Sequence, residues 1–163
     1  MPAFSGRESA VLFYCAGLAD SAKTIAEQKL QGATATEIRR PPNQDASMKE
    51  MHEAMVAKVY EDSFASARGY AVDFFGDCAH EVAKVSGEQA RFGVSCYQDA
   101  QLALDTVDLR IQGHSKRGII KQFSAMKGER SWKVIDKAWA AKKSRSDAAS
   151  DAWKQCMKPV TRG

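Results

Sequence analysis

The residues of this chain with the clearest potential for chemistry are its four cysteines, Cys15, Cys78, Cys96 and Cys156. None of their spacings is the short Cys-x-x-Cys of zinc ribbons and redox-active dithiols. Each half of the chain holds two of them, 63 residues apart in the first half and 60 in the second. We therefore predict disulfides between Cys15 and Cys78 and between Cys96 and Cys156, with four buried free thiols as the alternative.

These disulfides would have consequences for stability and for location. Closing a loop of this length stabilises a fold by about 4 kcal/mol in the chain-entropy model. Disulfides persist in oxidising compartments, so we expect a periplasmic or secreted protein. The first residues, 1–6, do not have the basic start, apolar stretch and cleavage site of a secretory leader. The expectation therefore includes a leader that was removed before this chain begins.

A second group of potential ligands is Met48, Met51, His52 and Met55, which fall on one face of a predicted helix. Thioether and imidazole groups together suit Cu(I), so Met48, Met51 and His52 form a candidate metal site. The alternative is that the methionines fill the core or form a partner-facing patch. We expect no other cofactor.

Basic side chains gather in the second half, where the candidate partner-binding residues are Arg117, Lys121, Arg130 and Lys133, with Lys127 between them. Such a face could bind an acidic protein, and a solvated helix surface is the alternative. The whole chain carries 24 basic and 20 acidic residues, a net charge of +4. This modest excess gives no reason to expect nucleic-acid binding.

Motifs of catalysis are not found in the sequence. It contains no serine nucleophile elbow, phosphate-binding glycine loop or helical zinc motif with two spaced histidines. Neither His80 nor His114 has a histidine or carboxylate at a ligand or triad spacing. We therefore expect a protein without enzymatic activity.

Comparison of the two halves reveals a repeat. Gln31-Gly32 follows Cys15 by sixteen residues, and Gln112-Gly113 follows Cys96 by the same distance. At this offset of 81, Lys29 also matches Arg110. With a deletion of three residues, the alignment continues through further pairs, which are Val59 with Ala138, Tyr60 with Trp139, Phe75 with Trp153, and Cys78 with Cys156. These matches predict a tandem duplication.

The elements that would position these residues are helices, because apolar residues recur every three or four positions and strand patterns are absent. We predict an all-α fold with about four helices in each half, the two halves (residues 1–85 and 86–163) packing as one compact protein. The expected helices are 8–31, 35–40, 46–61 and 66–85 in the first half, and 88–112, 115–126, 129–142 and 146–157 in the second. Tyr60 and Trp139 are expected to be buried in equivalent places. The longest apolar stretch, Ala10 to Ala19, is too short for a membrane span.

A small disulfide-stapled helical protein without a catalytic centre most often functions by binding. We expect a secreted or periplasmic interaction protein whose partner is another protein, acidic if the basic face binds it. An inhibitor or immunity protein for a secreted toxin or enzyme fits this description. Two alternatives remain open, namely a carrier of copper or of a small ligand and a cytosolic adaptor with reduced thiols.

Overall fold

The computed structural model of the protein describes residues 2–123 and 128–162. Within these residues it contains seven α-helices, two short 3₁₀ helices and two strands of two residues each, which confirms the predicted all-α class. Contacts along the chain divide it into two units. The first unit is Val11–Lys84, and the second unit combines Met1–Ala10 with Val85–Gly163.

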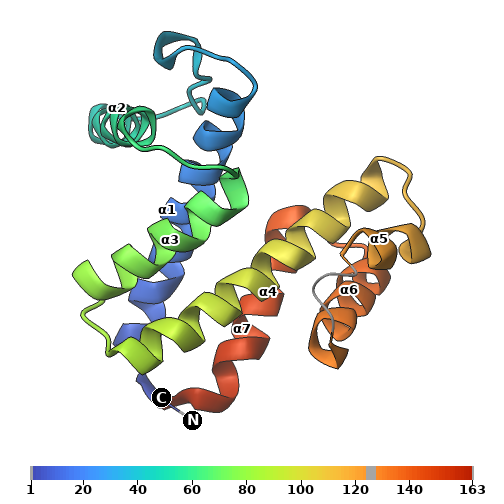
Figure 1. The fold of residues 1–163 in the computed structure, drawn as a ribbon. Coiled ribbons are helices and arrows are strands. Elements are labelled where there is room, and N and C mark those ends of the chain that lie inside the picture. The colour runs from blue at the N-terminus through green and yellow to red at the C-terminus, as the bar shows by residue number, and fades with distance from the viewer. Residues whose placement is uncertain (1, 124–127, 163) are drawn as a thin grey trace. The chain divides into compact units, whose positions relative to one another are not determined.

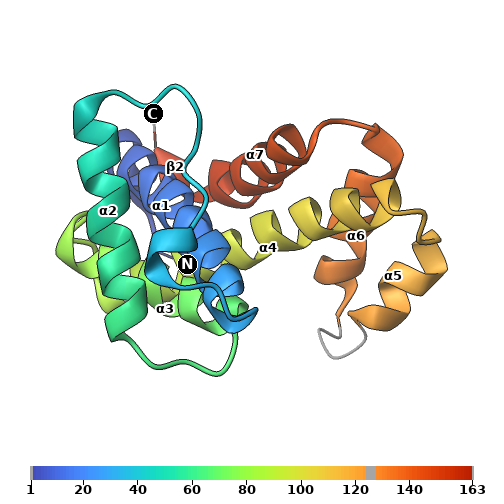
Figure 2. The same ribbon diagram turned by 90° about the horizontal axis from the view of Figure 1, so that it is seen from above.

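In the first unit, three α-helices surround one core. The helices are α1 (Gly6–Leu30, of which the part from Val11 onward belongs here), α2 (Ala46–Glu61) and α3 (Ala67–Glu81), with the 3₁₀ helix η1 (Ala35–Glu37) after α1. Helices α1 and α3 lie side by side, and α2 lies near the end of α1 (Figures 1 and 2). A disulfide joins Cys15 of α1 to Cys78 of α3. The core where the three helices meet includes Ile25, Val59 and Tyr70.

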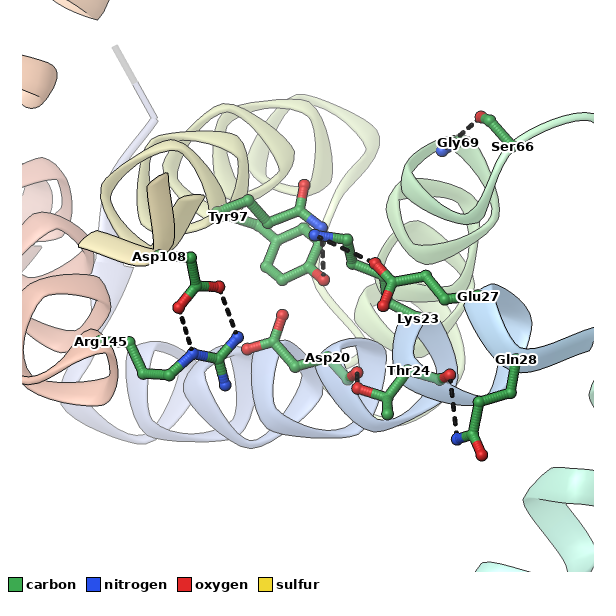
Figure 3. A network of polar contacts seen from close by, with 11 residues as sticks. Asp20, Lys23, Thr24, Glu27, Gln28, Ser66, Gly69, Tyr97, Asp108 and Arg145 are labelled. Carbon is green, nitrogen blue, oxygen red and sulfur yellow. Dashed lines mark hydrogen bonds and ion pairs between the residues drawn. The ribbon is translucent and has the colours of Figure 1, made fainter. Parts of the chain in front are cut away.

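The second unit is built on the long helix α4 (Gly87–Ile111). Helices α6 (Glu129–Ala141) and α7 (Arg145–Met157) both pack against α4, and α5 (Lys116–Gln122) packs against α6. A disulfide joins Cys96 of α4 to Cys156 of α7. The other end of α7 is held by Arg145, whose guanidinium donates two hydrogen bonds to the Asp108 carboxylate, at 2.9 and 3.0 Å (Figure 3). These two disulfides are the pairs that the sequence predicts.

The two long helices begin with the same local structure. At the start of α1, the Ser5 hydroxyl accepts from the Glu8 amide while the Glu8 carboxylate accepts from the Ser5 amide. Ser86 and Gln89 form the same reciprocal pair at the start of α4. Such capping boxes satisfy two backbone donors that a helix start otherwise leaves unpaired. Both pairs obey the offset of 81 found in the sequence.

The two long helices also end alike. Gly32 and Gly113, each two residues past the helix, have φ angles of 95° and 91°. This left-handed conformation costs glycine little. It lets the amides of Ala33 and His114 bond to the carbonyls of Gln28 and Leu109, each at 3.0 Å, as in a Schellman motif.

A basic side chain on each long helix holds the C-terminal end of another helix in the same unit. In the first unit, the Lys29 ammonium donates to the carbonyls of Val59, Tyr60 and Asp62 at the end of α2, at 3.1, 3.4 and 2.7 Å. In the second, the Arg110 guanidinium donates to the carbonyls of Ala138, Trp139 and Lys143, at 3.4, 3.0 and 3.4 Å. The cation satisfies carbonyls that have no partner inside their own helix and lies at the negative end of the helix dipole.

Several expectations differ from the structure. Strands were not predicted, yet β1 (Phe4–Ser5) pairs in parallel with β2 (Thr161–Arg162). Two-residue strands are too short for a period to appear in the sequence. The second helix of the first half is only η1, because the prolines that follow prevent its extension. The predicted helix 66–85 ends at Glu81, and Lys84 beyond it has a positive φ of 56°.

Two further expectations concern the second half and the aromatic pair. The predicted helix 115–126 is observed as α5, Lys116–Gln122, and residues 124–126 lie outside the described residues, as does the candidate Lys127. Tyr60 and Trp139 are half-buried rather than buried, and both have this intermediate exposure. The backbone carbonyl of each accepts a hydrogen bond from the cation of the long helix in its unit.

Candidate functional site

The best candidate for a functional site is a groove in the second unit, lined mainly by α6 and α7, with a volume of about 1160 Å³. Its size is sufficient for several side chains of a partner or for a small molecule. We call it the α6–α7 groove. Phe92 and Asp99 of α4 contribute to its wall.

The floor of the α6–α7 groove is made of small apolar side chains. Five residues that define it are Val134, Ala138 and Ala141 of α6 and Ala148 and Ala152 of α7. Ala138 and Ala148 also belong to the core cluster between α4, α6 and α7, where they are 6% and 5% exposed. Because alanine reaches only one carbon beyond the backbone, these side chains do not fill the space between α6 and α7. The groove therefore depends both on the small side chains and on the separation of the two helices.

The lining of the groove includes five cationic side chains, those of Arg130, Lys133, Lys137, Lys143 and Lys154, and four carboxylates, those of Asp99, Glu129, Asp136 and Asp151. Lys143 lies 2.5 Å from the Asp151 carboxylate. This hydrogen bond lowers the pKa of Asp151 and raises that of Lys143. Lys137 donates to the side-chain oxygen of Gln155 and forms no ion pair within the described residues, and its charge contributes to the lowered pKa of Asp151. The groove therefore offers an apolar floor beside a cation whose hydrogen-bond partner is neutral.

One wall of the groove contains the disulfide of the second unit. Arg130 donates from Nε and from one terminal nitrogen to the Asp99 carboxylate, at 3.0 and 2.8 Å, and that nitrogen also lies 2.9 Å from the Cys156 sulfur. Burial raises the pKa of Asp99, an effect that outweighs the lowering by Arg130. Cys156 is half-buried, whereas Cys15, Cys78 and Cys96 are buried. This wall is accordingly fixed by a covalent bond and an ion pair together.

The four candidate partner-binding residues are not brought together as one site. Arg130 and Lys133 lie on the rim of the groove, whereas Arg117 and Lys121 lie on α5 and do not line it. Arg130 is already bonded to Asp99, and Lys133 lies 3.1 Å from Glu129 of its own helix. Arg117 and Lys121 are exposed and have no acidic partner within the described residues. The predicted basic face is therefore two separate groups of side chains.

The candidate metal residues lie elsewhere, on α2 of the first unit. Met48 and Met51 are exposed at 49% and 47%, His52 is half-buried, and Met55 packs against the core of that unit. Within the described residues no group of three or more His, Cys, Asp or Glu side chains could hold a metal ion. Any metal site here would depend on the methionine sulfurs.

Sequence reasoning missed the residues that shape the groove, above all Ala148, Ala152 and Lys137. A signal for the two alanines was present, because the alignment that pairs Cys78 with Cys156 also places them opposite Tyr70 and Phe74. A change from large aromatic to alanine at two core positions indicates either a partner that fills the space or a loss of packing. The sequence alone did not distinguish these outcomes.

Within the described residues, none of the helices combines the length and apolar character needed to cross a bilayer. Comparison with protein-family models, with curated proteins and with solved structures found no significant match.

Proposed function

We propose that this protein is a secreted or periplasmic interaction protein that binds a segment of another protein in the α6–α7 groove. An inhibitor or immunity protein of a secreted toxin or enzyme would act in this way. The observation that carries the proposal is the groove itself, which combines an apolar floor with a rim of charged side chains of both signs. Apolar floors supply most of the binding free energy in such sites, while charges at the rim orient the partner and speed its association.

The disulfides support the part of the proposal that concerns location. Both cysteine pairs lie at bonding distance, 2.08 and 2.05 Å between sulfurs, and no cysteine of the described residues is left over. Small helical proteins with every cysteine paired are typical of oxidising compartments. A cytosolic adaptor would keep four reduced thiols and gain nothing from this pairing.

We further propose that the two halves of the chain, residues 1–85 and 86–163, derive from a tandem duplication. Three local structures support it: the capping boxes at Ser5 and Ser86, the glycine ends at Gly32 and Gly113, and the clamps made by Lys29 and Arg110. Helices α1 and α4 have 25 residues each and begin and end at the same offset of 81. The order of exposed and buried positions in 51–60 of α2 is also repeated in 130–139 of α6.

If the units are copies, their shared residues are explained by the fold, and partner binding belongs where they differ. Met48, Met51 and His52 of α2 differ from their counterparts in the second half, and so do the groove residues Ala148 and Ala152 of α7. The groove is the better candidate because it provides a concave surface, whereas Met48 and Met51 project from the helix into solvent.

Site-specific photo-crosslinking in the organism of origin tests the proposed function. A photoreactive residue replaces Lys154 on the groove rim, and a control variant carries it at Lys49 on α2. We expect a discrete cross-linked partner from position 154 and not from position 49. That cross-link should disappear when Ala152→Phe is added to fill the groove. A partner captured equally from both positions, or one that survives the filling, would contradict the proposal.

A copper carrier is the second candidate, favoured by the exposure of two methionines spaced one helical turn apart on α2. Titration of the intact protein with Cu(I) under anaerobic conditions distinguishes it. Uptake of one ion that is lost in Met51→Leu and retained in Ala152→Phe would favour the carrier. Unchanged uptake in Met51→Leu would exclude the methionine site.

A further inference from the structure

The place in the first unit that corresponds to the α6–α7 groove is filled by aromatic rings. Tyr70 of α3 contacts Phe64 and Phe74, with ring centroids 4.5 and 6.4 Å apart. The Lys29 ammonium lies over the Phe64 ring, 4.9 Å from its centroid. Tyr70 is 8% exposed, and Phe64 and Phe74 pack against the same core. Within the first unit, contacting aromatic rings thus fill the space between α2 and α3.

The alignment of the two units assigns counterparts to these rings. Ser66 caps the start of α3 and Ser144 caps the start of α7, at the same offset as Cys78 and Cys156. In this register Tyr70 corresponds to Ala148, and Phe74 corresponds to Ala152. Both alanines line the groove. Phe64 lies in the loop between α2 and α3, where the second unit has only the short turn Lys142-Lys143 with Lys142 at a φ of 50°.

A carboxylate is also replaced. In the first unit, Asp62 accepts a hydrogen bond from the Tyr70 hydroxyl at 2.7 Å and lies 3.4 Å from the ammonium of Lys58. The helix alignment pairs Lys58 with Lys137 and Asp62 with Ala141. Lys137 therefore keeps the position of a cation whose acidic partner, one turn later, has become alanine. Both Lys137 and Ala141 line the groove.

We infer that the α6–α7 groove binds a protein segment that presents an aromatic side chain next to a carboxylate. The ring takes the space above Ala148 and Ala152, and the carboxylate pairs with Lys137. The inference rests on the proposed function and specifies the chemistry of the partner. The occupant restores in the second unit the kinds of group that Tyr70, Phe74 and Asp62 supply in the first.

Two physical arguments favour an aromatic residue over an aliphatic one. A flat ring buries a large apolar area at the cost of only two side-chain torsions, and it gains further from contact with neighbouring cations. The first unit provides an example of this arrangement, since Lys29 lies near the rings of both Tyr60 and Phe64. The rim of the groove has lysines in comparable supply, among them Lys143 and Lys154.

Selection from a phage-displayed library of random dodecapeptides on the intact, oxidised protein tests this inference. The expected consensus is Phe, Tyr or Trp within a few positions of Asp or Glu. A selected peptide should bind Lys137→Met about three- to fivefold more weakly, because an exposed ion pair is lost. It should bind Ala152→Phe at least about thirtyfold more weakly, as expected for loss of a central pocket. Lys49→Met on α2 is the matched charge control and should bind unchanged.

The inference is overturned by a consensus without aromatic residues, by a basic consensus, by no enrichment, or by peptides that bind Ala152→Phe as well as the parent protein. Circular dichroism and retention of both disulfides must show that each variant is folded. If Ala152→Phe does not fold, the surface variant Lys137→Met still tests the inference. A cross-link from position 154 to a partner without an aromatic-acidic segment would defeat this inference alone. If position 154 of the otherwise unchanged protein gives no cross-link and the library gives no enrichment, the proposed function is defeated as well.

Discussion

Similar helices form two corners that differ in how they are filled. One corner lies between α2 and α3, and the other lies between α6 and α7. In the first unit the corner is closed by Tyr70, Phe64 and Phe74, and Asp62 ties the Tyr70 hydroxyl to the end of α2. In the second unit it is open, and alanines form the floor of a groove. The elements around both corners are alike, since each has a disulfide, a glycine-ended long helix and a cation on the carbonyls of another helix.

This difference indicates which features a small helical unit needs in order to fold and which it can change. Capping boxes, glycine ends and disulfides act on the backbone and on chain entropy, so they do not depend on what fills the corner. A unit held by these devices can fold with alanines at positions where the other unit has two aromatic rings. In the second unit those positions line an open groove.

The largest expected effects come from removing the disulfides. Cys15→Ala/Cys78→Ala and Cys96→Ala/Cys156→Ala should each lower the free energy of unfolding by about 4 kcal/mol, because the two loops of 63 and 60 residues are nearly equal. Urea denaturation of the whole protein measures the loss, and hydrogen exchange assigns it to a unit. A loss below about 1 kcal/mol in either variant would show that the unfolded chain is not constrained as the loop model requires.

Exchanging the residues that distinguish the two corners should have the next largest effect. Tyr70→Ala should destabilise the protein by about 3 kcal/mol, because it leaves a cavity and removes the bond to Asp62. Ala152→Phe should instead stabilise it by about 1 kcal/mol by burying part of a ring in the groove. Thermal unfolding monitored by circular dichroism measures both. Destabilisation by Ala152→Phe would show that the groove is too narrow for a ring. It would contradict the claim that the second corner is open where the first is filled.

Removing the two cationic clamps should have a smaller and similar effect in both units. Lys29→Met and Arg110→Met keep most of the apolar stem and remove the donors to the helix-end carbonyls. Each should cost about 1.5 kcal/mol, the usual contribution of a charge-assisted hydrogen bond. Lys49→Met, a surface lysine of α2, serves as the control and should change the free energy of unfolding by less than about 0.5 kcal/mol. Unequal losses would show that the two clamps are not equivalent.

The two disulfides should differ in their rate of reduction. Cys156 is half-buried, and the Arg130 guanidinium 2.9 Å from its sulfur would stabilise a thiolate leaving group. Reduced glutathione should therefore open Cys96–Cys156 before Cys15–Cys78, whose sulfurs belong to buried residues. Timed alkylation followed by peptide mapping gives the order. Arg130→Met should slow the first step, and an unchanged rate would show that exposure alone sets the order.

The smallest expected effect is a pH dependence of opposite sign in the two units. The Tyr70 hydrogen bond lowers the pKa of Asp62 from 3.8, so its contribution is present above that pH and is lost as the pH falls through the lowered value. Burial raises the pKa of Asp99 above 3.8, so its ionisation opposes folding at neutral pH, and this opposition is relieved as the pH falls toward 3.8.

Urea midpoints between about pH 7 and pH 2.5 test this contrast. The difference in urea midpoint between the parent protein and Asp62→Asn should change below pH 3.8. The corresponding difference for Asp99→Asn should change above pH 3.8. Two difference curves that change over the same pH range would contradict the assignment.

Much of the framework was predictable from the sequence because it depends on local rules. The disulfide pairs followed from the matched positions of Cys15 and Cys96, and the ends of the long helices followed from Gly32 and Gly113. The sequence showed Lys29 and Arg110 only as aligned basic residues and did not predict that they bind helix-end carbonyls. A side chain that reaches from one helix to the carbonyls of another leaves no periodic signal in the sequence. The aromatic residues Tyr60 and Trp139 were correctly paired in exposure but were expected to be more buried.

The groove was not predictable from residue types, because alanine can form tight helix contacts and can also line an open groove. Whether Ala148 and Ala152 face another side chain or open space depends on how far apart α6 and α7 lie, which is a tertiary property. The charged residues showed the same limit. The sequence predicts Arg130 as a partner-binding residue, whereas its bond to Asp99, 31 residues earlier, depends on the packing of α6 against α4.

The second unit is discontinuous in sequence, since Met1–Ala10 and Val85–Gly163 contribute to it while the first unit is the single stretch Val11–Lys84. During synthesis from the N-terminus, every residue of the first unit leaves the ribosome before α4 does. Phe4 and Ser5, by contrast, must wait for Thr161 and Arg162 at the other extreme of the chain. The order of translation thus lets the closed corner mature early and makes the unit with the groove the last to be assembled.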